Sequence, residues 1–401
     1  MKRQIYIVLP FLIAVALRLY PYFISGLPFS TDAWRPTRNA ELLVEHTPIR
    51  LDDEIFDGYD SYWPANSLFG AMISAVTGIE PLQAMAVFLP IIGSIAILIF
   101  YVLVKRLYNE KVSFIASIIF GTAFTHAFFT AGVTKETYAN PLYLLLILIF
   151  LHPTISNRKK ALLFAVMSIT LALTHHLTPV ITIAILSSLA LARFINHTKK
   201  GLAPNKSDFT LVSTLAVATT IYYLIYGQAG FKLTLTLSDW LSVASYQILT
   251  FAIAVYLISK PHVQSQSRTF ITTLGTTALA PLLLLLAIKI PFAGFPTLPK
   301  HCLLYFSPYV ITLPLITLGY GFRKRIKGPL VLLFWLAPLM GLEAYATFSN
   351  SILSSILWIR IPNFLYAPLA IFAAAGLYRL HEISKKPRLQ NLIKPAVVTI
   401  I

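Results

Sequence analysis

The chain has 401 residues, of which 57% are hydrophobic and 12% are charged, whereas charged residues make up about 25% of typical soluble domains. This composition excludes an ordinary soluble protein and indicates a polytopic membrane protein. The formal net charge of +17 would fit nucleic-acid binding, but the basic residues lie in short clusters between apolar runs. Orientation in the bilayer explains such clusters better, so we expect no nucleic-acid partner. Cys302 is the only cysteine, which excludes an intrachain disulfide and a cysteine-based zinc site and argues against redox chemistry.

Apolar runs of about 20 residues, bounded by charges or by Pro and Gly, predict twelve membrane-spanning helices. In chain order they lie at residues 4–24, 82–104, 112–131, 138–152, 161–174, 177–195, 209–227, 241–259, 269–290, 301–321, 328–348 and 356–378. Because the runs recur along the whole length, no separate soluble domain is expected. Residues 1–401 are predicted to form one transmembrane domain of the all-α class.

The loops predicted to lie inside are basic throughout. With Lys2 and Arg3 on the cytoplasmic side, every second loop carries Lys or Arg, as the positive-inside rule requires. We therefore expect a plasma-membrane protein with both termini in the cytoplasm. Small residues at Ala14-Val15-Ala16 would allow cleavage of a signal peptide, but the apolar run continues to Ile24 and indicates a retained anchor.

The first predicted external loop, residues 25–81, is the longest in the chain, and long loops are commonly functional. Two short helices are expected in it, one reading AWRPTRNAELLVE and one near residues 65–77. Asp32 is placed to cap the first helix, and Trp34, Leu42 and Leu43 are placed to face lipid headgroups. Residues 25–60 of this loop hold eight of the 15 acidic residues: Asp32, Glu41, Glu45, Asp52, Asp53, Glu54, Asp57 and Asp60.

Several stretches, all at predicted external ends, resemble the GT-C membrane glycosyltransferases. The opening ALRLYPYFISGLPFSTDAWRPTRNAELL is similar to the family's first helix, which ends in an Arg and is followed by an acidic residue. The other similar stretches are YWPANSLFGAMISAVTGIEP, VTKETYANPLYLLL, LALTHHLTPVITI and WIRIPNFLYAPLAIFAAAGL. The likeness extends to the families of dolichyl-phosphate-mannose protein mannosyltransferases and aminoarabinose transferases. The chain has no WWD-type signature and no C-terminal soluble domain, so we do not expect the catalytic subunit of an oligosaccharyltransferase.

The resemblance implies a sugar donor carried on a polyprenyl (dolichyl-like) phosphate and transfer at the external face. The acceptor would be a glycan, a lipid or a protein, and membrane lipids are further partners. Residues 1–200 would form the catalytic module, with the external loop 25–81, and residues 201–401 would shape the cavity for the lipid donor. The chemistry needs a base for the acceptor, positive charge at the departing phosphate and a groove for the isoprenoid tail.

Asp32 matches the family's catalytic acidic position, and we predict that it is the base; the alternative is a helix cap without a chemical role. Glu136, in TKETY, is the second catalytic candidate and would position the acceptor or a metal. Its alternative is a local surface pair with Lys135. His175 and His176, in THHLTP, would contact the donor phosphate or a metal, or would only cap the turn between two spans. His126 and His152 are expected to be structural.

Asp52, Asp53 and Glu54, with Asp57 and Asp60 nearby, supply the hard oxygen ligands that Mg²⁺ or Mn²⁺ prefers, although exposed acidic clusters are more often only solvated. No cofactor is required by the pattern. Arg18, Lys300 and Arg360 are basic residues near predicted outer ends, against the general charge trend, so each could bind the donor phosphate. Snorkelling to lipid headgroups is the alternative.

A twelve-helix secondary transporter or a lipid-carrier flippase is the competing functional class. Transporters tend to have repeats and broken helices at the midplane. We find no half-to-half repeat, and the polar residues gather at external ends. A non-catalytic lipid-binding scaffold would keep the grooves but would need neither Asp32 nor Glu136.

Overall fold

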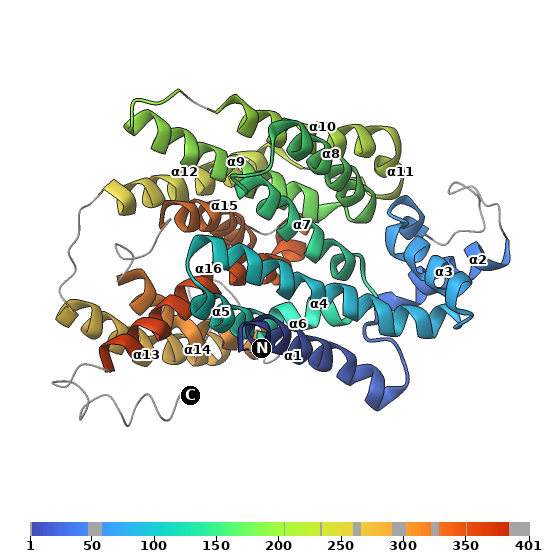
Figure 1. The fold of residues 1–401 in the computed structure, drawn as a ribbon, viewed down its shortest axis with the longest axis horizontal. Coiled ribbons are helices and arrows are strands. Elements are labelled where there is room, and N and C mark those ends of the chain that lie inside the picture. The colour runs from blue at the N-terminus through green and yellow to red at the C-terminus, as the bar shows by residue number, and fades with distance from the viewer. Residues whose placement is uncertain are drawn as a thin grey trace.

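The apolar runs of the sequence all form helices in the computed structural model, which describes residues 2–46, 58–203, 205–232, 235–259, 266–290, 302–321, 329–349 and 351–384 (Figure 1). Within these ranges there is no strand, so the all-α prediction is confirmed. The helices are α1 (Lys2–Ser25), α2 (Trp34–Glu45), α3 (Ala65–Thr77), α4 (Pro81–Leu107), α5 (Glu110–Thr122), α6 (Phe124–Ala131), α7 (Lys135–Leu151), α8 (Asn157–Thr174), α9 (Leu177–Lys199), α10 (Lys206–Tyr222), α11 (Gln228–Gly230), α12 (Leu237–Ser259), α13 (Gln266–Lys289), α14 (Cys302–Gly321), α15 (Pro329–Phe348) and α16 (Ile352–Ser384).

Each of the twelve predicted spans coincides with one of these helices or with a bent pair. In the described part of the chain, eight helices are individually long and apolar enough to cross a membrane, and α5 with α6 makes a ninth candidate. The eight are α1, α4, α9, α10 with the turn that follows it, α12, α14, α15 and α16. α7 has 17 residues, and α8 begins with three basic residues among its first four. The chain is therefore a multi-pass membrane protein.

The predicted span 112–131 is broken into α5 and α6, which meet at 63°. A break inside a membrane leaves carbonyl groups that another part of the protein must satisfy. Arg18, which is 1% exposed, donates from Nη1 to the Gly121 carbonyl in the last turn of α5 at 3.1 Å. Its Nε donates to Thr130 Oγ1 at 2.7 Å. The structure thus places Arg18 inside the bundle as a cap for the broken helix, and not at an outer surface.

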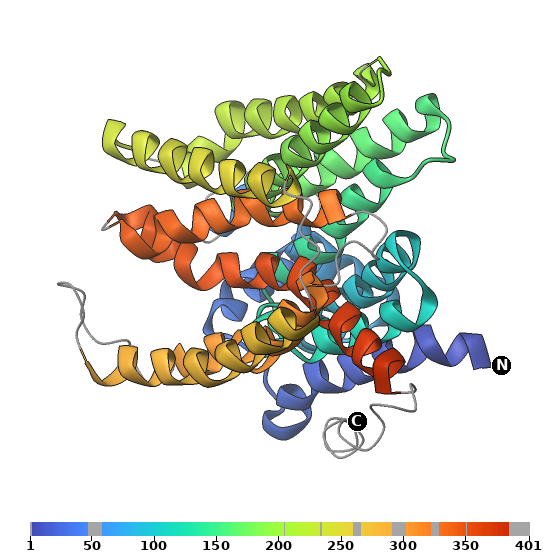
Figure 2. The ribbon, with the colours of Figure 1, turned by 90° about the vertical axis from the view of Figure 1, so that its left-hand side faces the viewer.

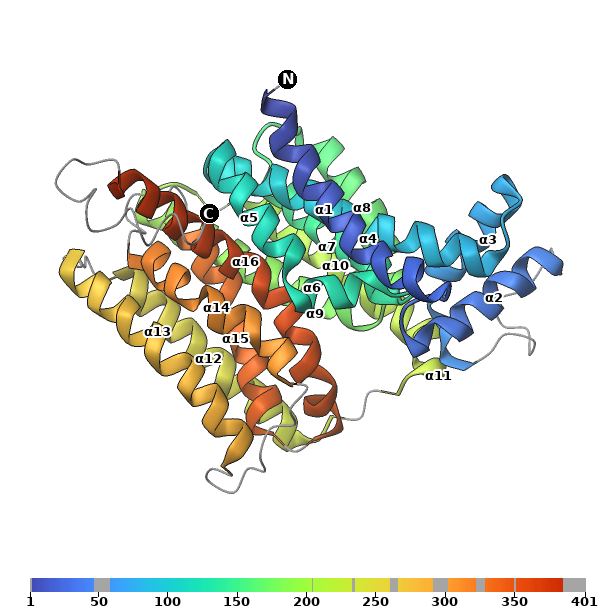
Figure 3. The same ribbon diagram turned by 90° about the horizontal axis from the view of Figure 1, so that it is seen from below.

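Predicted external and internal loops gather at opposite ends of the bundle. At one end, α2 and α3 project beyond the other helices (Figures 1 and 3). Here the Val133 amide donates to the Phe29 carbonyl at 3.3 Å, which joins the first and second predicted external loops. At the other end, Lys160 Nζ and Arg193 Nη1 both donate to the Phe150 carbonyl at 3.2 Å.

The first loop has the two short helices that the sequence predicts, but their faces differ from the expectation. Leu42 and Leu43 of α2 are buried, so they do not face lipid headgroups as predicted; Trp34 is exposed. The apolar stripe exposed in this loop lies on α3, at Leu68, Met72 and Val76. The four-residue spacing places these three side chains on one face of the helix.

The C-terminal helices pack through small residues. Figure 2 shows α13 and α14 side by side and apart from α10 and α12, and α14 also packs on α16. A Cβ atom on Gly319 of α14 would lie 1.9 Å from the Phe372 carbonyl oxygen, and one on Gly376 of α16 would lie 2.1 Å from that of Leu315. Only glycine allows this backbone approach, which is common between membrane helices.

Candidate functional site

A buried ion pair joins the first loop to the start of α7. Thr134 caps α7 by accepting a hydrogen bond from the Thr137 amide at 3.4 Å, and this fixes the first turn where Lys135 begins. Lys135 is 4% exposed, pairs with Asp60, and has its ammonium 5.5 Å from the centroid of the Trp63 ring. Asp60 is therefore engaged by a cation. The prediction that Asp60 could serve as a metal ligand does not fit this contact.

Asp32 lies beside this pair and is exposed. Burial lowers the pKa of Lys135, and the carboxylates of Asp60 and Asp32 oppose that shift by favouring the charged ammonium. The prediction that Asp32 caps the first helix of the loop is wrong. Ser30 caps the 3₁₀ turn Thr31–Ala33, because its side chain accepts a hydrogen bond from the Asp32 amide at 3.2 Å. The helix α2 itself has no side-chain cap. The Asp32 carboxylate is thus not used to cap a helix.

Glu136, the next residue of α7, is 9% exposed and has partners other than those of Lys135. It forms an ion pair with Arg360 of α16, and its Oε1 lies 3.4 Å from His175 Nε2. The alternative interpretation of Glu136, a local surface pair with Lys135, is therefore wrong. Two of the residues proposed for the donor phosphate, Arg360 and His175, meet at this carboxylate.

The tautomer of His175 follows from its neighbours. The ring is buried in the turn between α8 and α9, and Nδ1 accepts from the Thr178 amide at 3.3 Å. The proton of the neutral ring then belongs on Nε2, the atom that faces Glu136. Burial, with charge from Lys135 nearby, lowers the pKa of His175 well below its ordinary value, so the ring is neutral at physiological pH. His175 thus both caps α9 and contacts Glu136.

His176 is held between aromatic rings. Its ring centroid lies 5.2 Å from that of Trp63 and 4.8 Å from that of Phe231, which follows α11. Burial lowers the pKa of His176 to about 4, so it too is uncharged at neutral pH. The positive charge next to Glu136 and the two histidines therefore comes from Arg360 and Lys135, and the charge of Arg35 also acts on Lys135.

A hydrogen-bonded network positions the Glu136–Arg360 pair. Asn140 Nδ2 donates to the Glu136 carbonyl at 2.8 Å, and Asn363 Nδ2 donates to Asn140 Oδ1 at 3.4 Å. The Asn363 Oδ1 lies 2.9 Å from His126 Nδ1 and can only accept, so that nitrogen of His126 is the donor. Asn363 follows Arg360 by one helical turn, so the network fixes α16 against α7. The expectation that His126 is structural fits this contact.

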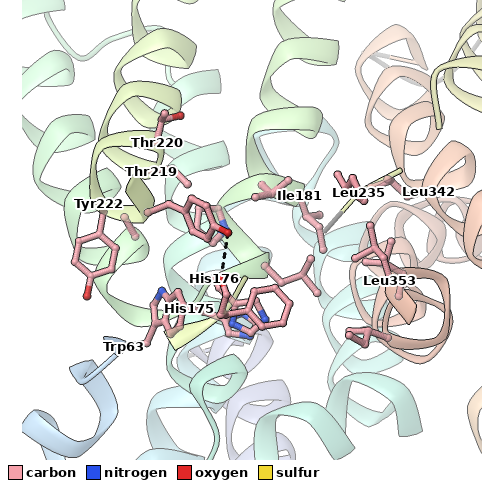
Figure 4. Close-up of a pocket in the computed structure, with 18 of the residues that line it drawn as sticks. Trp63, His175, His176, Ile181, Thr219, Thr220, Tyr222, Leu235, Leu342 and Leu353 are labelled. Carbon is pink, nitrogen blue, oxygen red and sulfur yellow. Dashed lines mark hydrogen bonds between the residues drawn. The ribbon is translucent and has the colours of Figure 1, made fainter. Parts of the chain in front are cut away.

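An apolar cavity of about 340 Å³ opens beside the two histidines (Figure 4). This volume is in the range of ligand pockets, about 300–1,000 Å³. Trp63, His175 and His176 form one wall, Thr219, Thr220 and Tyr222 of α10 a second, and Leu342 and Leu353 lie across from them. The remaining lining residues come mainly from α9, α12 and α16 and are almost all apolar.

Some predicted site residues lie elsewhere. Arg18 is used inside the bundle, as described above, so the structure gives no support for its contact with a phosphate. Lys300, Asp52, Asp53 and Glu54 lie outside the described residues. Within the described ranges, no three His, Cys, Asp or Glu side chains are grouped as a metal site requires. The carboxylates of Asp60 and Glu136 already face Lys135 and Arg360, so the described residues do not fit a bound Mg²⁺ or Mn²⁺.

Neither a protein-family model nor a curated protein sequence matches the chain. Among solved structures, the fold is similar to the oligosaccharyltransferase of Archaeoglobus fulgidus tethered to an acceptor peptide, with a TM-score of 0.56 and 15% identity over 97% of this chain and 51% of that one. A second similar structure is that of oligosaccharyltransferase AglB from the same organism, in complex with an inhibitory peptide and a dolichol-phosphate. Its TM-score is 0.54, with 16% identity over 98% of this chain and 52% of the matched chain. A third structure, of the oligosaccharyltransferase in complex with Zn and sulfate, has a TM-score of 0.53 and 16% identity, over 98% of this chain and 51% of the matched chain.

The chain thus spans about half the length of the oligosaccharyltransferases it matches. At this level of identity the likeness shows the fold alone, and a multi-pass fold of this kind is what the GT-C resemblance of the sequence motifs implies. The fold match is thus to oligosaccharyltransferases, whose catalytic subunit the sequence motifs did not lead us to expect.

Proposed function

We propose that the chain is a GT-C-type glycosyltransferase that moves a sugar from a polyprenyl-phosphate donor to an acceptor. One observation carries the proposal: two neutral histidines line an apolar cavity, and the Glu136–Arg360 pair and the Lys135 ammonium lie next to these histidines. These are the parts that transfer from a lipid-linked phosphate requires. The oligosaccharyltransferase AglB, whose fold the chain shares, binds a dolichol-phosphate, which supports a lipid carrier here.

In the proposed reaction, Asp32 takes the proton of the acceptor hydroxyl or amine as that atom attacks the anomeric carbon of the sugar. The bond between the anomeric carbon and the phosphate oxygen breaks, and its electron pair leaves with the polyprenyl phosphate. Asp32 suits the first task because its carboxylate is exposed and caps no helix. The Lys135 ammonium lies close enough to Asp32 for the two charges to interact.

The departing phosphate gains negative charge, and Arg360 and Lys135 are the described cations placed to stabilise it. Both are preorganised by a carboxylate, Glu136 and Asp60 respectively, so little reorganisation is needed when the phosphate arrives. Glu136 acts as a positioning residue for Arg360 and His175. The neutral His175 and His176 can donate hydrogen bonds without adding charge.

The isoprenoid tail would enter the apolar cavity. Residues from both halves of the chain line it, Trp63 to Ile181 from the first half and Thr219 to Leu357 from the second. The expected division, in which residues 1–200 supply the chemistry and residues 201–401 shape the lipid cavity, is therefore not strict, because Arg360 of the second half contacts Glu136 of the first. The acceptor class stays open among peptide, glycan and lipid.

The proposal is tested by reconstituting the chain in liposomes with radiolabelled polyprenyl-phosphate sugars and a panel of peptide, glycan and lipid acceptors. We expect protein-dependent transfer with at least one donor and acceptor pair. Folded protein that transfers nothing across the panel, yet moves the lipid carrier across the bilayer, would reject the transferase in favour of the flippase or transporter.

We further propose that the site faces outside and both termini are cytoplasmic, because the basic loops lie at the far end of the bundle. In a variant with Cys302 replaced, a cysteine at Arg38 should react with a membrane-impermeant maleimide on intact cells. A cysteine at Lys159 should react only after permeabilisation. Both side chains are exposed in the structure, so each serves as the accessibility control for the other. Labelling of position 159 on intact cells would reverse the orientation.

A further inference from the structure

A second apolar cavity lies directly behind the first. Its volume is about 780 Å³, and it runs between α8 and α10. Two residues line both cavities: Ala172, in the last turn of α8, and Tyr222, the last residue of α10. Figure 4 shows Tyr222 at the side of the first cavity opposite Leu342 and Leu353. The Ala172 side chain is a single methyl group, so the ring of Tyr222 is the larger part of the partition.

The wall of the second cavity faces away from the protein interior. Ile169 of α8 and Val217, Ile221 and Ile225 of the α10 segment line it, and each is more than half exposed. In a membrane protein such side chains contact lipid. The first cavity is thus lined by His175 and His176 of the candidate site, and the second adjoins it at Ala172 and Tyr222 and lies at the lipid-facing surface of α8 and α10.

Tyr222 is also tied to the site loop. Its hydroxyl donates to the Tyr62 carbonyl at 2.5 Å, next to Trp63. The chain after Tyr222 forms a π-helical turn, Tyr223–Gly227, a structure that is frequent at functional sites. A Cβ atom on Gly227 would lie 3.0 Å from the Trp63 ring, and one on Gly230 would lie 2.3 Å from the Tyr62 ring. The two glycines let the loop that carries Asp60 and Trp63 seat against the end of α10.

Resting on the proposed function, we propose that the polyprenyl tail passes between Tyr222 and Ala172 and that its distal part occupies the α8–α10 cavity. Tyr222 is then a specificity-determining residue for tail length. A short-tailed phosphate needs only the first cavity, whereas a long-tailed one needs both. The second cavity is the larger of the two and shares the Ala172 and Tyr222 wall with the first, which favours this path over an exit on the α12 and α15 side.

The test uses a polyprenyl phosphate without sugar, which carries a photoreactive diazirine at the far end of its tail. After irradiation in liposomes, mass spectrometry of the full chain identifies the labelled residues. We expect adducts on the α8–α10 wall, at Ile169, Val217, Ile221 or Ile225. In Ala172→Phe these adducts should fall by about tenfold or more, the change that excluding a few methylene groups from an apolar site produces.

Ala161→Phe is the matched control, because Ala161 is an exposed alanine of the same helix and lines neither cavity. If Ala172→Phe does not fold, Ala172→Leu replaces it, and the adduct map of the unaltered protein is decisive by itself. Adducts on Trp240, Val243 or Leu342 would overturn the tail path but leave the lipid-linked donor in place. No saturable adduct at either cavity would overturn the path together with the proposed function.

Discussion

Asp32→Asn is expected to abolish sugar transfer while leaving folding and donor binding nearly unchanged. Asn has no useful proton affinity near neutral pH, and loss of general-base assistance typically lowers the rate by about 10²- to 10⁴-fold. Loss of a helix cap would not explain a loss of activity in this variant, because Ser30 caps the turn and the Asp32 side chain is exposed. The measurement is transfer from a radiolabelled polyprenyl-phosphate sugar, with a thermal melt and donor binding on the same sample.

Glu41→Gln is the matched control. Glu41 lies on α2 in the same loop and forms a partly exposed pair with Arg38, with 3.1 Å between Oε2 and Nη1. Exposed pairs of this kind contribute about 0–1 kcal/mol, so the control should transfer normally and melt at nearly the same temperature. Transfer by Asp32→Asn at the rate of the control would exclude Asp32 as the base.

The arrangement of helices was accessible from sequence because the bilayer imposes it. An apolar run of a given length has few alternatives to a helix, and the charges between runs sort the loops to two ends. The break between α5 and α6 was not accessible. It depends on Arg18, more than 100 residues earlier in the chain, which satisfies the Gly121 carbonyl. When each apolar run is considered separately, Arg18 is interpreted as a cation near the membrane surface.

Several of the candidate residues lie near one another in the structure, but the sequence did not indicate how they pair. Sequence placed Asp32, Glu136, His175, His176 and Arg360 at external ends, and the described residues bring these ends together. Nothing in the adjacency of Lys135 and Glu136 indicates that their side chains turn to Asp60 and Arg360, because those partners are distant in sequence. The stretch YDSYWP offered a signal for Asp60 and Trp63, since an acid and an aromatic ring two to three residues apart suit one buried cation.

Arg360→Ala is expected to raise the KM for the polyprenyl-phosphate sugar by about tenfold or more, because a charge-assisted hydrogen bond contributes about 1.5–3 kcal/mol. Arg360→Lys should recover only part of this loss, since Lys cannot form the bidentate fork. The single Ala variant has a second effect, however. It leaves the Glu136 carboxylate buried without its cation, and breaking a buried pair from one side costs about 3–5 kcal/mol of stability.

The double variant Arg360→Ala with Glu136→Gln separates these two effects. It removes both charges, so the stability lost in Arg360→Ala should return, as measured by the melting temperature in detergent. If Arg360 binds the donor phosphate, the raised KM persists in the double variant because no cation has been restored. If Arg360 serves only to neutralise Glu136, KM returns with stability, and the phosphate role passes to Lys135. The two outcomes differ in donor kinetics alone, at matched stability, and therefore decide the role of Arg360.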